Sequence, residues 1–178
     1  MDFSTVASQL WPCWMLGIFM IYCTWKSQHK DLLRVEVKPL LKFMRILAII
    51  AVCRFFMFKF FLPAASLESA KAMAHMIPLP ALLGTFWEDA AHSMPLVIAG
   101  LMFGTKKWYG VLSKIALVVV SLSFGSGHIY QGLLPAIAIC FYIPVAMKLG
   151  KQYGFGTVMI SHILYDLSTI ISIRMMLG

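Results

Sequence analysis

Six acidic or histidine side chains lie inside apolar stretches of this sequence, where charged and titratable groups are rare. Placing such a group at the centre of an apolar layer costs about 2.5 to 3.5 kcal/mol, so these residues usually face a bundle interior and often mark a functional site. They occur in the runs FWEDAAHS, FGSGH and SHILYD and are Glu88, Asp89, His92, His128, His162 and Asp166. Carboxylates and imidazoles commonly move protons in enzymes, so the chemistry expected here is general acid–base catalysis.

The spacing of these residues suggests that they share a pocket. Side chains four residues apart lie on the same face of an α-helix. This spacing relates two residues in each run, namely Glu88 with His92, Phe124 with His128, and His162 with Asp166. Three neighbouring helices could therefore direct polar groups into one central pocket. A carboxylate held there could accept a proton from water, which is the role of a general base.

Each residue also has a simpler interpretation as a packing contact. A polar side chain in an apolar layer can hydrogen-bond to a neighbouring helix and contribute about 1 kcal/mol to their association. This explains one such residue more readily than four together, so the expected site is Glu88, His128, His162 and Asp166. Asp89 and His92 fit either interpretation and are candidate modulators.

The elements that must position these residues are hydrophobic helices. Of 178 residues, 61% are hydrophobic and 12% are charged, which is far more apolar than a soluble domain. A helix needs about 20 apolar residues to cross a bilayer, and such runs recur along the chain. We predict an all-α fold, a polytopic membrane bundle of about six helices. The expected spans are Leu10–Trp25, Phe43–Leu62, Leu79–Phe103, a fourth that begins between Trp108 and Lys114, Leu134–Met147 and Val158–Leu177.

The chain is expected to form one membrane domain over residues 1–178. Residues 1–66 supply accessory helices, and residues 79–177 form the core that carries the motifs. A glycine-rich connection, LGKQYGFGT, is expected between the fifth and sixth spans.

The depths of two histidines conflict in a plain zigzag of helices. His162 lies about one to two turns into the sixth span, whereas His128 lies in or beyond the middle of the fourth. The two can meet if the fourth span begins near Lys114 and bends at Gly125 and Gly127.

The basic residues predict the orientation of the chain. The formal charge is +8, but the cations lie between apolar runs and form no basic patch with interleaved aromatics, so no nucleic-acid partner is expected. Short cytoplasmic loops are enriched in Lys and Arg, which places both termini on the non-cytoplasmic side. The cations on the predicted cytoplasmic side are Lys26, Lys30, Arg34, Lys38, Lys42, Arg45, Lys106, Lys107, Lys114, Lys148 and Lys151.

The four cysteines and the N-terminus carry no further signal. Cys13, Cys23, Cys53 and Cys140 lie singly inside expected spans, so they are interpreted as small packing residues rather than disulfide partners or metal ligands. The first apolar run lacks a basic leader and a small-residue cleavage site, and we expect it to be retained.

The order of the three runs resembles the type II CAAX prenyl protease and bacteriocin-processing family of membrane proteins, also called CPBP or ABI. That family has EExxxR, FxxxH and HxxxN or HxxxD on successive helices, with a glycine-containing loop before the last histidine. The corresponding elements here are Glu88-Asp89, Phe124 to His128, the loop in GKQYGFGTVMISH, and His162 to Asp166. The likeness covers roughly Leu79 to Leu177. This sequence departs from the pattern at Asp89, where the family has Glu, and at Ser93, where it has Arg.

The resemblance implies an intramembrane endopeptidase in which Glu88 and His128 activate a water molecule. It also implies that His162 and Asp166 stabilise the oxyanion of the tetrahedral intermediate, to which well-placed donors contribute about 3 to 4 kcal/mol. In this scheme Asp89 tunes Glu88, and His92 substitutes for the arginine. No cofactor is expected. The expected partners are the lipid bilayer and a peptide or protein substrate, of which prenylated and membrane-bound chains are examples.

Three alternatives stay open from the sequence. The first is a metal-dependent membrane hydrolase with Glu88, His128 and His162 as zinc ligands, although no HExxH run supports it. The second is a proton-coupled transporter, in which the same groups relay protons. The third is a catalytically silent immunity or binding protein on the same scaffold.

Overall fold

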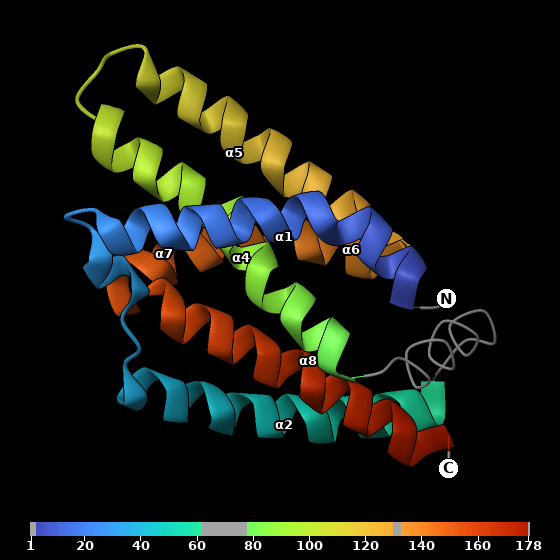
Figure 1. The fold of residues 1–178 in the computed structure, drawn as a ribbon. Helices are drawn as coiled ribbons and strands as arrows, with labels where there is room; N and C mark the ends of the chain where they lie inside the picture. Colours follow the sequence, from blue (N-terminus) through green and yellow to red (C-terminus); the bar gives the residue numbers. More distant parts are fainter. Residues whose placement is uncertain (1–2, 62–77, 130–132, 178) are drawn as a thin grey trace.

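The computed structural model describes residues 3–61, 78–129 and 133–177, and these ranges are helical with no strand (Figure 1). The prediction of an all-α fold is confirmed for them. The connection between the second and third expected spans lies outside the described residues. The elements are α1 (Phe3–Lys26), the short 3-10 helix η1 (Lys30–Leu33), α2 (Val37–Phe61), α4 (Pro78–Phe103), α5 (Tyr109–Ser126), α6 (Leu133–Cys140), α7 (Tyr142–Tyr153) and α8 (Phe155–Leu177).

Two helices within the described ranges are long and apolar enough to cross a bilayer. They are α5 over Tyr109–Ser126 and α8 over Phe155–Met175. The first three expected spans coincide in position with α1, α2 and α4. A chain with apolar helices of spanning length is therefore confirmed, and the number of crossings stays a prediction.

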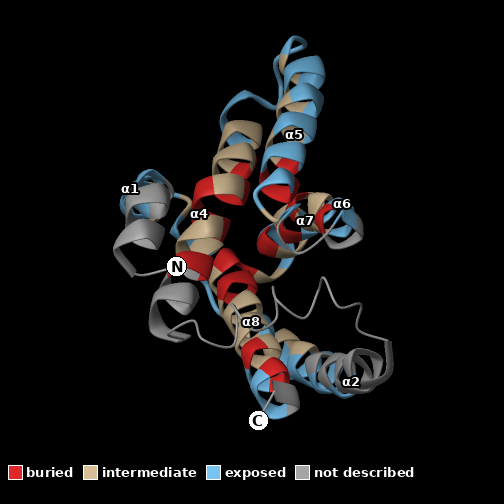
Figure 2. Cartoon of the chain, turned by 90° about the vertical axis from the view of Figure 1, so that its right-hand side faces the viewer, coloured by how far each residue is buried: buried red, intermediate tan, exposed pale blue. Residues whose placement is uncertain are grey.

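Helices α4 and α8 lie at the centre of the bundle. Helix α1 packs along α4 and α2 packs along α8, while α5, α6 and α7 adjoin the other side (Figures 1 and 2). The apolar faces of α4 and α8 meet because each carries large side chains at helical spacing. The fully buried cluster between them consists of Ala90, Met94, Val97, Phe155 and Met159.

The fifth expected span is not one helix. The prediction of a continuous span over Leu134–Met147 was wrong, because α6 ends at Cys140 and α7 begins at Tyr142. Pro144 gives the physical reason: it has no N–H to donate to the carbonyl four residues earlier, so proline is tolerated in a first turn but not within a helix. The break creates a new helix start that carries Tyr142.

The expected glycine-rich connection is also mostly helical. Helix α7 continues to Tyr153 and α8 begins at Phe155, which leaves Gly154 between them with φ of 87°. The glycines instead allow close packing: the Phe155 ring lies over Gly150, and a Cβ on Gly154 would collide with the backbone of Arg34. The earlier start of α8 places His162 seven residues, about 10 Å, from its first residue.

The segment between α1 and α2 is fastened to the start of α8. Arg34 donates from Nη2 to the Gln152 carbonyl at 2.6 Å and pairs through Nε with Glu36 Oε1 at 2.9 Å. The Glu36 amide donates to Thr157 Oγ1 at 2.8 Å, and Thr157 is fully buried. These contacts hold the segment joining the N-terminal helices against the α7–α8 corner.

The hairpin formed by the end of α4 and the start of α5 projects away from the other helices (Figures 1 and 2). Helix α5 therefore rejoins the bundle through its last turns, where Ser121, Phe124 and Gly125 are buried. Gly125 permits this contact, because a Cβ there would overlap Cys140 Sγ and lie 2.7 Å from the Ala136 carbonyl oxygen.

Candidate active site

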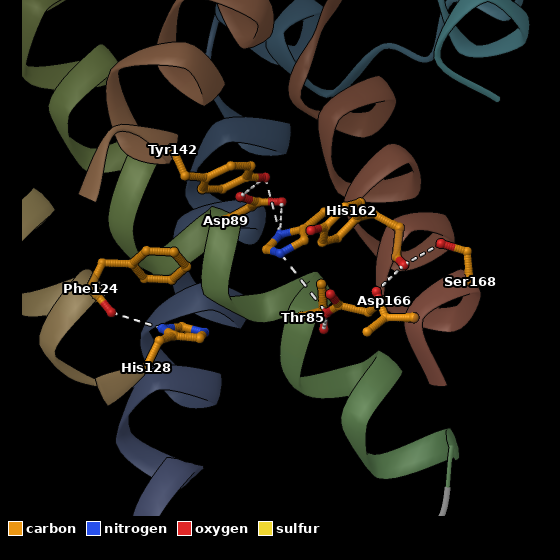
Figure 3. A network of polar contacts seen from close by, with 10 residues as sticks. Thr85, Asp89, Phe124, His128, Tyr142, His162, Asp166 and Ser168 are labelled. Atoms are coloured by element: carbon orange, nitrogen blue, oxygen red, sulfur yellow. Dashed lines mark hydrogen bonds and ion pairs between the residues drawn. The ribbon is translucent and has the colours of Figure 1, made fainter. Parts of the chain in front are cut away.

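Four segments bring the candidate residues together. Helix α4 carries the first group on one face, α8 carries the last, α7 begins next to them, and the end of α5 approaches from the side. Figure 3 shows the resulting polar network. The candidate site as a whole comprises Thr85, Glu88, Asp89 and His92 from α4, Phe124 and His128 from the end of α5, Tyr142 from α7, and His162 and Asp166 from α8.

A buried group of three polar side chains lies at the centre. The Tyr142 hydroxyl donates to Asp89 Oδ1 at 2.7 Å and lies 3.0 Å from His162 Nδ1. His162 Nδ1 is in turn 3.1 Å from Asp89 Oδ2. Asp89 is 1% exposed, so its charge is shielded from water and depends on these two partners. The three side chains join α4, α7 and α8 at one point.

The donors in this group determine where the hydrogen on His162 lies. A tyrosine hydroxyl has one hydrogen, and that of Tyr142 goes to Asp89. The tyrosine oxygen can then only accept from the imidazole, so Nδ1 of His162 carries a hydrogen and shares it with Tyr142 Oη and Asp89 Oδ2. The second ring nitrogen, Nε2, is left to face the remaining site residues. An imidazole oriented in this way through Nδ1 resembles the histidine of a hydrolytic triad.

Asp166 is held mainly by Thr85. The Thr85 hydroxyl donates to Asp166 Oδ2 at 2.6 Å, whereas His162 Nε2 lies 3.9 Å from the same oxygen. The longer distance exceeds that of a hydrogen bond, so Asp166 contributes a nearby charge. The carboxylate that orients His162 is Asp89, which the sequence had suggested as a modulator of Glu88.

Glu88 lies among the other charged candidates. Its carboxyl interacts electrostatically with His162, His128, Asp166 and Asp89. The predicted set of four residues is therefore brought into one region. Two further carboxylates lie near Glu88. A proton gained or lost by a neighbouring histidine therefore changes the net charge around the Glu88 carboxyl.

His128 and His92 join the site through aromatic contacts. His128 lies in the turn after α5 and donates from Nδ1 to the Phe124 carbonyl at 2.8 Å, and His92 does the same to the Glu88 carbonyl at 2.9 Å. A backbone carbonyl only accepts, so both rings carry their hydrogen on Nδ1. The Phe124 ring is 5.1 Å from the His92 ring and 4.9 Å from the His128 ring.

The same phenylalanine connects His128 to His162. The Phe124 ring stacks on Tyr142 at 5.7 Å, and the Tyr142 ring is 4.6 Å from the His162 ring. This path of ring contacts from His128 to His162 follows from the end of α5 at Ser126 and the start of α8 at Phe155. Helix α5 begins at Tyr109 rather than near Lys114. The bend predicted at Gly125 and Gly127 takes the form of a helix end, because α5 stops at Ser126.

Two site residues were missed from the sequence. Tyr142 stands in the apolar run FYIP and offered no motif, although a buried tyrosine hydroxyl normally needs a partner. Thr85 did offer a signal, because it precedes Glu88 by three residues and Asp89 by four and so lies on their face of the helix.

Ser93 stands where the resembled family has arginine. It is 0% exposed, and within the described part of the chain its hydroxyl has no hydrogen-bond partner. This position therefore holds a small, fully buried side chain.

Metal ligands are usually His, Cys, Asp or Glu side chains that lie close together. Among the described residues, no three His, Cys, Asp or Glu side chains lie close enough together to hold a metal ion. The alternative zinc ligands Glu88, His128 and His162 do not form such a group in this conformation.

Comparisons with protein-family models, with curated proteins and with solved structures found no match for this chain.

Proposed function

We propose that this chain is a membrane-embedded hydrolase that cleaves peptide bonds. The observation that carries the proposal is the orientation of His162, whose Nδ1 is fixed by Asp89 and Tyr142 so that Nε2 faces a site containing Glu88. A histidine oriented by a buried carboxylate can gain a proton on Nε2 while that carboxylate offsets the charge.

The residues divide into two roles. Glu88 is the general base that takes a proton from the attacking water, and His128 holds that water on the opposite side. Glu88 then passes this proton to the amide nitrogen as the C–N bond breaks and the amine leaves. His162, with a proton on each ring nitrogen, donates from Nε2 to the oxyanion that forms at the substrate carbonyl. Thr85 keeps the charge of Asp166 turned toward its own hydroxyl and so limits repulsion of the oxyanion.

A location within a bilayer is part of the proposal. Large apolar side chains are exposed on α1 and α5, among them Phe19 at 60% and Val119 at 58%, and such surfaces are rarely left in water over so large an area. The helix ends that carry most of the cations gather at one end of the bundle (Figure 1). We infer six crossings with both termini on the non-cytoplasmic side. A reporter fused to Gly178 should be active outside the cytoplasm, and activity inside would contradict this orientation.

Cleavage of fluorogenic peptides by the protein purified in detergent tests the reaction. Peptides with and without a lipid tail should be compared, since the substrate class is open. Glu88→Gln and His162→Ala should each lower kcat/KM by about 100-fold or more, because general acid–base groups and oxyanion donors contribute at this level.

The matched control is Glu36→Gln, which neutralises an exposed carboxyl on the segment between α1 and α2. It should retain the parent rate. Cleavage that survives both site variants would refute the assignment, and so would a rate that falls equally in the control. Loss of cleavage on treatment with a chelator, restored by zinc, would favour the metal-dependent alternative instead.

A further inference from the structure

A groove of about 320 Å³ lies between α1 and α4, on residues that the candidate active site does not use. Its walls are mostly apolar. Its polar residues lie close together in the sequence, at and just after the end of α1. The groove is lined by Met20, Cys23, Thr24, Ser27, Gln28, His29, Ile98 and Met102.

The groove results from the way in which α1 and α4 cross. The two helices approach closely at Gly17, where a Cβ would lie 2.6 Å from the Trp87 carbonyl oxygen. Beyond this point they diverge toward Lys26 and Phe103, as Figure 1 shows. Small residues bring helices together, and side chains further along no longer fill the widening space between them.

Polarity changes along the groove in one direction. Met20 and Ile98 form its inner part, and Gln28 and His29 lie at its outer end, just beyond the end of α1. The hydroxyls of Thr24 and Ser27 are already bonded to backbone carbonyls. An elongated ligand with an apolar chain and a polar head matches this profile, whereas a uniformly polar ligand does not.

Cations lie at the ends of both helices that form the groove. Lys26 ends α1 and Lys30 begins η1, while Lys106 and Lys107 follow the last residue of α4. All four are exposed. Among the described residues from Lys26 to Leu33, the single acidic residue is Asp31. The charged residues at these helix ends are therefore mostly positive, which suits a ligand with a negatively charged head.

Aromatic residues at this end suit the surface of a bilayer. The Lys26 ammonium lies 4.7 Å from the centre of the Trp25 ring and 6.0 Å from that of Tyr22. Trp25 is 60% exposed. Exposed tryptophan and tyrosine beside lysine are typical of residues at the level of lipid headgroups.

We propose that this groove binds one anionic phospholipid. An acyl chain lies between α1 and α4, and the phosphate lies over Gln28 and His29 near Lys26 and Lys30. A zwitterionic lipid fits between the same walls, but the cations attract its headgroup less strongly. The site is separate from the proposed peptidase chemistry and does not depend on it.

Native mass spectrometry of the full chain in detergent tests the proposal. The protein is incubated with phosphatidylglycerol or with phosphatidylcholine that has identical acyl chains. Retention of one phosphatidylglycerol should exceed that of phosphatidylcholine by about fivefold for each lysine near the phosphate, because one basic residue near an anionic lipid contributes about this factor. The double variant Lys26→Gln, Lys30→Gln should lose most of the preference.

A second variant tests the walls. Ile98→Trp fills the groove and should abolish retention of both lipids. If Ile98→Trp does not fold, Met102→Trp replaces a 61% exposed side chain and serves the same purpose. The matched controls lie on α5, where Lys114→Gln and Val119→Trp make the same changes at exposed positions outside the groove.

Equal retention of the two lipids by the parent protein would overturn the proposal. It would also be overturned if the folded groove-filling variant kept phosphatidylglycerol at the parent level, or if Lys114→Gln reduced the preference as much as the double variant. Loss of preference in the double variant together with loss of retention in Ile98→Trp is the expected result.

Discussion

Two ionic contacts near helix α8 differ in their surroundings. Near its start, the Arg34–Glu36 pair is 2.9 Å long, with both side chains 39% exposed. Further along, the His162–Asp89 pair is 3.1 Å long, with side chains 12% and 1% exposed. Similar distances therefore conceal different energetics: an exposed pair contributes about 0 to 1 kcal/mol, whereas removing one partner of a buried pair costs about 3 to 5 kcal/mol.

The comparison also separates anchoring from chemistry. The exposed pair acts with backbone contacts to hold a loop against the α7–α8 corner. The buried pair fixes one ring nitrogen of His162 and leaves the other facing the site. A contact that contributes little to stability can thus still position a segment, and a contact that is costly to break can fix the orientation of a side chain in the candidate site.

The largest expected effect comes from Asp89→Ala. The change leaves His162 Nδ1 and the Tyr142 hydroxyl without their shared acceptor, so the free energy of unfolding should fall by about 3 to 5 kcal/mol. Thermal unfolding in detergent measures this. Asp31→Ala, at an exposed acid on η1, is the control and should unfold at the parent temperature. If Asp89→Ala lowered the free energy of unfolding by less than about 1 kcal/mol, the buried pair would contribute no more to stability than the exposed pair.

The second effect concerns the corner that the exposed pair holds. Gly154→Ala introduces a Cβ at φ of 87° and ψ of 145°, a backbone region used almost solely by glycine, at a cost of about 1 to 3 kcal/mol. The unfolding temperature should fall. Gly110→Ala is the matched control, because a Cβ there meets nothing within 4 Å. An equal response in both variants would show that the corner does not constrain α8.

The third effect separates Tyr142 from Asp89. Tyr142→Phe removes one hydroxyl but leaves His162 Nδ1 its bond to Asp89, so stability should fall by about 1 kcal/mol. The peptidase rate should fall further than this loss of stability explains, because the imidazole is no longer held on two sides. A nitrogen-15 NMR spectrum of labelled histidine should still show hydrogen on Nδ1 of His162. Its movement to Nε2 would contradict the assigned donors.

The smallest effect is expected at the exposed pair itself. A double-mutant cycle with Arg34→Ala and Glu36→Ala should give a coupling energy below about 1 kcal/mol, because both side chains are accessible to water. Chemical denaturation of the two single variants and the double variant measures it. A coupling as large as that between Asp89 and His162 would mean that exposure does not explain the difference between the two pairs.

Hydrophobic periodicity and motif order predicted much of this structure. The positions of α1, α2 and α4 followed from long apolar runs, and the shared helix face of His162 and Asp166 followed from their i, i+4 spacing. These features depend on local sequence, which is why they could be anticipated. The six crossings and the peptidase reaction stay predictions.

Other features depend on tertiary contacts that no single run encodes. The break before Tyr142 was hidden because the residues on both sides are apolar, and hydropathy does not distinguish one helix from two. The helical course of the residues before Gly154 was missed because glycines suggest a loop, whereas here they accommodate Phe155 and Arg34. The pairing of Asp89 with His162 required knowing which helix faces which.

The close contact of Gly125 with α6 limits how this sequence can change. Any side chain at that position would overlap Cys140 Sγ and press on the Ala136 carbonyl, which would push α6 away from Phe124 and hence from the aromatic contacts that place His128. The serines on either side, Ser123 and Ser126, are exposed. In a library of random substitutions over FGSGH, function should therefore tolerate many residues at position 126 and almost none other than glycine at position 125.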